Sequence, residues 1–280
     1  MLATALVFFR EVLEAALVIG ILAAATVGVA RRTRWLAAGV FAGLVGAICV
    51  ALSAEALAAA AEGMGQELFN ASVLFAAVGM LSWHTVWMSR HGRELASSLG
   101  KVGSDIAAGT RGLGALALVV GLAVLREGAE IVLILQGLTA SGVTTNASLL
   151  AGGALGMLAG GGLGYAIFRG LKLIPTRWLF AATSGLIALL AAGMASHAVA
   201  FLVQSGHVEV LTETAWDTSA LLSDQGLVGQ AMAALVGYTA TPMWIQVVAY
   251  MATLGLILAL AALPTASKPK TRGAPAPALT

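Results

Sequence analysis

The chain has 280 residues, of which 59% are hydrophobic and 10% charged, and its mean hydropathy is +0.94. A soluble domain has about 25% charged residues, so a water-soluble fold of this size is excluded. The formal net charge of +2 excludes a strongly basic nucleic-acid binder, and the single cysteine, Cys49, excludes a disulfide framework and a cysteine-based zinc site.

Seven apolar runs follow one another along the chain, each near the roughly 20 residues that a transmembrane helix needs. They cover residues 2–29, 36–60, 68–89, 113–138, 148–168, 178–204 and 241–263. The first run has no basic region before its apolar core, so we expect a retained helix rather than a cleaved signal peptide. Residues 90–112 could form an interfacial helix. The sequence therefore predicts an all-α polytopic membrane protein with seven transmembrane helices.

The positions of the basic residues predict the orientation of these spans. Thirteen of the 15 bases lie outside the spans, and all of them follow spans one, three, five or seven. Loops rich in Lys and Arg stay in the cytoplasm, so we expect an outer N-terminus and a cytoplasmic C-terminus in the cell membrane. The opposite loops carry acids without a base, including Glu209, Glu213 and Asp217 in the last one. These acids would attract cations, although exclusion of bases from translocated loops gives the same pattern.

Two charge clusters interrupt the spans. The first span contains Arg10, Glu11 and Glu14, and the fourth contains Arg126, Glu127 and Glu130. At 3.6 residues per turn, each Arg shares a helix face with the second Glu of its cluster. Unpaired, each charge would cost about 2.5 to 3.5 kcal/mol at mid-membrane, which disfavours a chance origin. The structural alternative is that each Arg only neutralises a Glu and holds two helices together.

Charge and depth predict a shared cation site. Two Arg and four Glu leave a formal charge of −2, which a proton or a bound cation must compensate. Both clusters lie about 25 Å of helix from the cytoplasmic boundary, which is near the middle of the membrane. Four carboxylates suit a hard or borderline cation, so iron, manganese, magnesium and calcium all fit.

The two clusters belong to an internal repeat. They are 116 residues apart, and Gly79-Met80-Leu81-Ser82-Trp83-His84 has an echo in Gly193-Met194-Ala195-Ser196-His197. Two halves of three spans each must have opposite orientations, as in transporters with a midplane site. His84 and His197 are then either ligands at the entry or exit or histidines satisfied by their neighbours. Glycines at four-residue spacing, namely Gly39, Gly43, Gly152, Gly156, Gly160 and Gly164, predict helix packing faces.

The predicted organisation has five parts. Residues 1–112 form the first three-helix repeat with its cytoplasmic loop, and 113–204 form the second repeat. An acidic outer loop covers 205–240, the seventh helix covers 241–263, and 264–280 form a disordered cytoplasmic tail, rich in proline and bases.

Two Arg-Glu-x-x-Glu motifs on a seven-span chain resemble the oxidase-dependent iron transporter family, which comprises fungal high-affinity iron permeases and bacterial iron-uptake permeases. Trp216-Asp217-Thr218-Ser219, Gly237-Tyr238, Pro242, Gln246 and Tyr250 are similar to that family's last outer loop and seventh span. The resemblance covers residues 1–263. It implies that Fe(III) or Fe(II) passes into the cell, with Glu11, Glu14, Glu127 and Glu130 as metal ligands and Arg10 and Arg126 as their charge partners. It also implies a separate extracytoplasmic oxidase or iron-binding protein.

We therefore expect a permease rather than an enzyme, with the iron ion as transported substrate and no permanently bound cofactor. Its partners are the lipid bilayer and the iron ion, no nucleic acid is expected, and a homo-oligomer is left open. The pathway would include His84, His197, Glu209, Glu213 and Asp217. One alternative is a transporter of another divalent metal, such as manganese or lead. The other is a proton-relay subunit or intramembrane enzyme that uses the carboxylates as acid and base.

Overall fold

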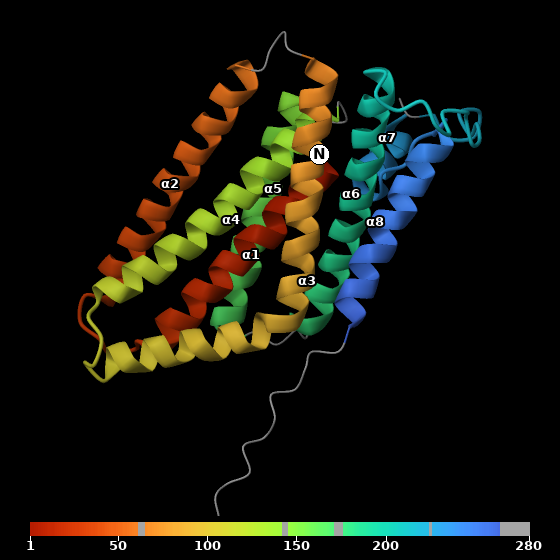
Figure 1. The fold of residues 1–280 in the computed structure, drawn as a ribbon. Helices are drawn as coiled ribbons and strands as arrows, with labels where there is room; N and C mark the ends of the chain where they lie inside the picture. Colours follow the sequence, from red (N-terminus) through yellow and green to blue (C-terminus); the bar gives the residue numbers. More distant parts are fainter. Residues whose placement is uncertain (61–64, 142–144, 171–175, 224–225, 264–280) are drawn as a thin grey trace, which may run out of the picture.

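A computed structural model describes residues 1–60, 65–141, 145–170, 176–223 and 226–263. Within these residues the regular elements are helices, accompanied by one isolated bridge between Thr214 and Met243. The helices are α1 (Leu2–Ala25), α2 (Arg32–Ala60), α3 (Gln66–Ala107), α4 (Gly114–Ala140), α5 (Asn146–Phe168), α6 (Thr176–Gln204), α7 (Leu227–Val236) and α8 (Trp244–Ala262) (Figure 1). The prediction of an all-α protein is confirmed. The predicted tail, 264–280, lies outside the described residues.

Five helical segments in the described part of the chain are long and apolar enough to cross a membrane: Arg32–Ala56, Gln66–Gly92, Asn146–Phe168, Phe180–Gln204 and Trp244–Ala262. With 24 and 27 residues, α1 and α4 are as long as these segments, but each carries three charged residues near its middle. These are the two helices with the Arg-Glu-x-x-Glu motifs. The count of seven spans and the inverted relation of the repeats stay predictions.

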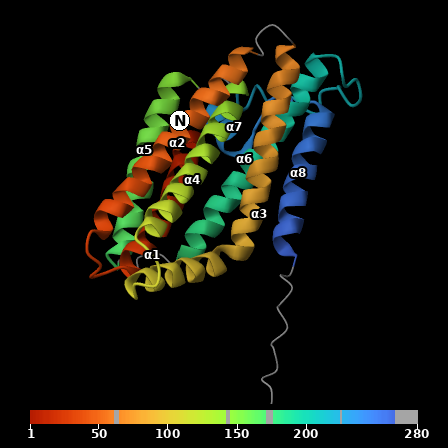
Figure 2. The same ribbon diagram turned by 60° about the vertical axis from the view of Figure 1, so that its left-hand side comes forward.

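Glycines let each motif-bearing helix pack closely on a partner. A Cβ atom added to Gly160 of α5 would lie 2.5 Å from the carbonyl oxygen of Phe9 in α1. In the other pair, a Cβ on Gly39 of α2 would lie 2.6 Å from the carbonyl oxygen of Ala117 in α4. Gly43, Gly152, Gly156 and Gly164 make similar approaches. The predicted packing faces are confirmed, and α2 runs alongside α4 in both ribbon views (Figures 1 and 2).

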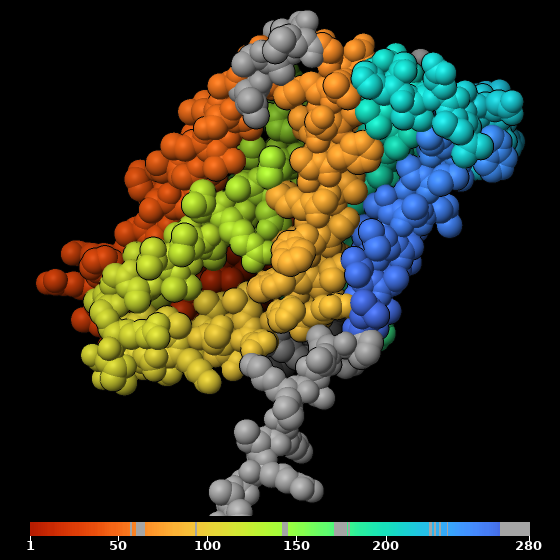
Figure 3. All heavy atoms as spheres, viewed as in Figure 1, coloured from red at the N-terminus to blue at the C-terminus, as the bar shows by residue number. Residues whose placement is uncertain are grey.

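Helix α3 is longer than its span. Its 42 residues continue past the apolar segment and turn across the lower end of the bundle (Figure 1). Leu99 and Ile106 of this lower part are buried against Leu22 of α1 and against Leu116 and Val120 of α4. The segment considered for an interfacial helix is thus a continuation of α3 as far as Ala107. Figure 3 shows a hollow between α4 and lower α3, with atoms of α1 at its floor.

The described parts of the segment 205–240 contain a helix and hydrogen bonds to the residues just before α8. The helix is α7, and the backbone N–H of Ala215 donates to the carbonyl of Pro242 at 2.8 Å, just before α8 begins. The Thr218 N–H likewise donates to the carbonyl of Ala240 at 2.9 Å. At the end of α7, Gly237 has a φ of 69° and lies against Gly193 of α6, where a side chain would not fit. Ala215 and Thr218 are therefore held to the start of α8, and the end of α7 packs on α6.

Candidate metal centre

The two charge clusters meet inside the helix bundle. Helices α1, α3 and α4 contact one another, and this brings the motif of α1 and that of α4 to the same place. Arg10, Glu11, Glu14, Glu127 and Glu130 are each at most 6% exposed, and only Arg126 is partly open, with 39% of its side chain exposed. His84 of α3 joins them and is 1% exposed. We call these seven residues the charge cluster.

Ion pairs inside the charge cluster repeat between the helices. The Nε atom of Arg10 lies 3.1 Å from Glu14 Oε1, and Nε of Arg126 lies 3.1 Å from Glu130 Oε1. Each Arg thus pairs with the Glu four residues on, as the helical period predicts. Arg10 also donates to Glu11 at 3.0 Å. Arg126 differs, because it lies over the ring of Trp87, 5.1 Å from the centroid, and faces His84.

Four members of the cluster lie close enough to share one ion. Glu11, His84, Glu127 and Glu130 each offer one ligand atom, and these atoms lie within 4.8 Å of one another. The carboxyl groups of Glu11 and Glu127 face each other across α1 and α4. Glu11 Oε2 and Glu127 Oε2 have no hydrogen-bond partner among the described residues. Buried carboxylate oxygens without donors are costly, so this arrangement suits a bound cation.

Buried apolar side chains lie on both sides of the charge cluster along its helices. Val7 of α1, Leu81 of α3 and Ile134 of α4 belong to one buried apolar cluster. Leu22 of α1 and Val124 of α4 belong to another, which includes the lower part of α3. The charge cluster therefore lies between two apolar layers, and Arg126 is its partly exposed member.

The family model for the iron permease FTR1 family matches residues 1–273. The chain belongs to the iron permease FTR1 family. A ferrous iron permease EfeU of Escherichia coli O6:H1 (strain CFT073) is 32% identical over 243 residues, covering 85% of this chain and 86% of the relative. The EfeU of Yersinia pestis is 30% identical over 268 residues, covering 94% and 93%. No solved structure matches the chain.

Family membership and several apolar helices make this permease a multi-pass membrane protein of iron transport. Because its relatives are named as permeases, a transporter is favoured over the enzyme that was one of the alternatives.

The sequence placed His84 among the pathway candidates and outside the two motifs. It stands five residues before residue 89, near which the apolar run of its span ends. In the permease, α3 continues to Ala107, and His84 lies at the level of both motifs. The sequence does contain a sign that the helix continues. Beyond the apolar run, apolar residues recur at helical spacing at Leu95, Leu99, Val102 and Ile106.

The other pathway candidates lie apart from the charge cluster. His197 of α6 lines a narrow space with Ser141 and Gly237. Glu209, Glu213 and Asp217 are exposed in the segment between α6 and α7. Asp217 Oδ1 accepts hydrogen bonds from the Ser219 hydroxyl at 2.5 Å and from its backbone N–H at 2.9 Å, and these bonds lower the pKa of Asp217.

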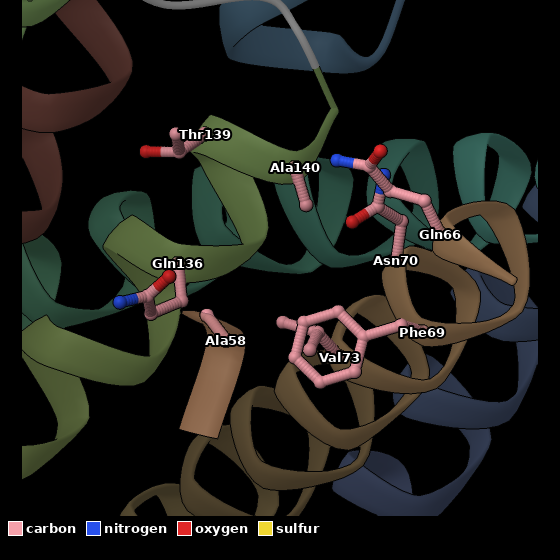
Figure 4. A pocket seen from close by; sticks show the side chains of 8 residues that line it. All are labelled: Ala58, Gln66, Phe69, Asn70, Val73, Gln136, Thr139 and Ala140. Carbon is pink, nitrogen blue, oxygen red and sulfur yellow. The ribbon is translucent and has the colours of Figure 1, made fainter. Parts of the chain in front are cut away.

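A cavity of about 240 Å³, lined by both polar and apolar side chains, opens between α2, α3 and α4 (Figure 4). Its lining includes Ala58, Gln66, Phe69, Asn70, Val73, Gln136, Thr139 and Ala140. Gln136 follows Glu130 by six residues on α4, which is about 9 Å of helix. Amide and hydroxyl groups thus line the side of α4 that lies beyond the charge cluster toward the upper end of the bundle.

Proposed function

We propose that the chain carries Fe(II) across the cytoplasmic membrane into the cell, without a permanent cofactor, and that the charge cluster is its binding site at mid-membrane. The observation that carries the proposal is the pair of facing carboxylates, Glu11 and Glu127, each with a buried oxygen that lacks a donor. Glu14 and Glu130 complete the carboxylate set, and Arg10 and Arg126 neutralise part of its charge.

Charge balance favours the ferrous ion if metal binding leaves all four Glu ionised, both Arg charged and His84 neutral. The cluster then carries −2, so Fe(II) makes the sum zero and Fe(III) makes it +1. A buried group without net charge avoids the cost of an uncompensated ion in a low dielectric. The relatives from Escherichia coli and Yersinia pestis are named ferrous iron permeases, which agrees with this choice.

The distribution of charge supports the direction of transport. The α1–α2 and α3–α4 connections, which carry Arg31 and Arg111, lie at the lower end of the bundle (Figure 1). By the positive-inside rule this end is cytoplasmic. The upper end bears the exposed acids Glu209, Glu213 and Asp217, which raise the local concentration of cations. The cavity beside Gln136 would receive the ion from that side, directly or from a separate oxidase or iron-binding protein.

Packing supports two inverted repeats. Suppose that α1 of the first repeat corresponds to α4 of the second, and α2 to α5. The contact between α1 and α5 then corresponds to the contact between α4 and α2. Both pairs are present, and both use close-packed glycines. Movement of one half against the other would open first one apolar layer and then the other, which exposes the charge cluster alternately to each side.

The test is anaerobic uptake of radioactive Fe(II) by vesicles that contain the purified full chain. The double variant Glu11→Gln, Glu127→Gln should reduce the uptake rate by more than about 100-fold. Substituting a residue that only hydrogen-bonds a metal ligand already lowers metal affinity or activity by about 10- to 100-fold, and this variant removes two ligands. The control is Glu55→Gln, an exposed acid of α2 outside the cluster, which should keep the rate. Uptake that survives in the double variant would overturn the proposal. Competition by Mn(II) or Pb(II) separates another metal from iron, and proton flux without bound metal would indicate a proton relay.

A further inference from the structure

His84 occupies a place that the paired motifs do not explain. It comes from α3, outside both motifs, yet it lies between a glutamate of α1 and one of α4. Its Nε2 atom is 3.2 Å from Glu14 Oε2, and its Nδ1 atom contacts Glu130 Oε2. Nη2 of Arg126 lies 2.9 Å from the same Nδ1. The imidazole therefore links the two motifs through its two nitrogens.

Each nitrogen of the ring lies beside a carboxylate oxygen, Nε2 beside Glu14 Oε2 and Nδ1 beside Glu130 Oε2. Without an ion, either nitrogen can donate a hydrogen to its carboxylate. An ion bound at Nδ1 takes the place of that hydrogen, so Nδ1 and Glu130 Oε2 would both present lone pairs to it. Nε2 then carries the hydrogen of the neutral ring and donates to Glu14.

Glu14 and Glu130 have matching contacts, because each has an Arg Nε beside Oε1 and a nitrogen of His84 beside Oε2. Of these two, Glu130 is one of the four residues whose ligand atoms lie within 4.8 Å of one another. Glu14 instead lies 3.2 Å from the other ring nitrogen, Nε2. Its contacts match those of a carboxylate that orients a metal-binding histidine from the far side of the ring.

We propose that His84 binds the transported ion through Nδ1, together with Glu11, Glu127 and Glu130, and that Glu14 orients the imidazole. This inference rests on the proposed function and departs from the resemblance, which implies four glutamate ligands. One imidazole among carboxylates favours borderline ions such as Fe(II), Mn(II) and Co(II) over Mg(II) and Ca(II). On binding, Arg126 leaves Nδ1, and its partly exposed side chain already lies over Trp87.

The test uses Mn(II) as a spectroscopic probe of the full chain in detergent, without oxygen. Electron spin echo modulation should show one coordinated nitrogen in the wild type, and titration with Fe(II) should displace the Mn(II). His84→Gln should lose the nitrogen signal, and His197→Gln, a matched change of a histidine on α6, should keep it. If His84→Gln does not fold, wild-type protein labelled with ¹⁵N-histidine replaces it, because the modulation must then change to that of ¹⁵N.

Glu14 gives a second, independent readout. Glu14→Gln keeps an oxygen that accepts a hydrogen bond from Nε2, so the nitrogen signal should persist. Affinity for Mn(II) should fall about tenfold, as is common when a residue that orients a metal ligand is substituted. Glu11→Gln removes a ligand itself, so it should weaken Mn(II) binding by more than about 100-fold, the upper limit for substituting an orienting residue. Equal losses in the two variants would contradict the division of roles.

The results separate this inference from the proposed function. Mn(II) that binds through Glu11 and Glu127 without any nitrogen signal would overturn the role of His84 and leave the proposed function standing. A wild-type chain that binds neither Mn(II) nor Fe(II) would overturn both. A nitrogen signal that survives in His84→Gln would also overturn the role of His84.

Discussion

The contact between α5 and α1 allows a test with an internal control. In Gly160→Ala, the new Cβ would lie 2.5 Å from the carbonyl oxygen of Phe9 and 3.2 Å from its Cα. Both are backbone atoms that cannot rotate away, so α1 has to move next to Arg10. Gly162, two residues along α5, has nothing within 4 Å of an added Cβ. Gly162→Ala is therefore the same chemical change without the clash.

The expected difference follows from two opposing effects. Alanine is better than glycine inside a helix by about 0.5 to 1 kcal/mol, and both variants gain this. Overpacking costs about 1 to 3 kcal/mol, and only Gly160→Ala suffers it. The two variants should thus differ by about 2 kcal/mol in the free energy of unfolding, which is about 30-fold in the equilibrium constant.

Unfolding of the purified variants in detergent, followed by circular dichroism, measures this difference. We expect Gly162→Ala to be at least as stable as the wild type and Gly160→Ala to be less stable. Uptake of Fe(II) should fall only in Gly160→Ala, since Phe9 adjoins the first residue of the motif. Equal stability of the two variants would refute the close packing of α5 on α1.

Three further predictions follow from the charge cluster, the outer segment and the cavity. Arg10→Met should lower the stability of the folded chain by about 3 to 5 kcal/mol, because it leaves buried carboxylates unpaired; an unchanged thermal unfolding transition would speak against this pairing. Ser219→Ala should raise the pKa of Asp217, measured by NMR, because the Ser219 hydroxyl and N–H lower it now. The stabilisation of the folded chain by these bonds is full above the ordinary carboxyl pKa and is lost as the pH falls through the lowered pKa of Asp217. An unshifted titration of Asp217 in Ser219→Ala would contradict the contact. Gln136→Leu should raise the KM for iron uptake about fivefold, which corresponds to one lost hydrogen bond of about 1 kcal/mol. The affinity of the purified chain in detergent for the metal ion should not change. An unaltered KM would exclude the cavity from the pathway.

The meeting of the two motifs could be predicted because charge and depth both restrict it. Six charges at the same depth in two apolar helices have few partners other than one another. The glycine faces were equally predictable, because glycine at four-residue spacing on an apolar helix permits backbone contact. Gly160 and Gly39 show that contact on α1 and α4.

The place of His84 and the existence of α7 could not be predicted in the same way. His84 was positioned by the end of its apolar run, but α3 continues to Ala107 by packing Leu99 and Ile106 on the lower apolar cluster. Helix α7 has only ten residues and is followed by Gly237, so its apolar stretch is too short to mark a span. Its position depends on the close contact with Gly193, which the local sequence does not encode.

The most direct test of the central claim is the position of iron in the protein itself. Crystals of the full chain loaded with Fe(II) without oxygen would show iron by its anomalous scattering. We predict one peak inside the charge cluster, bonded to Glu11, Glu127 and Glu130 and absent in the Glu11→Gln, Glu127→Gln variant. Iron bound only elsewhere, or a chain that transports iron with no peak among these carboxylates, would contradict the account.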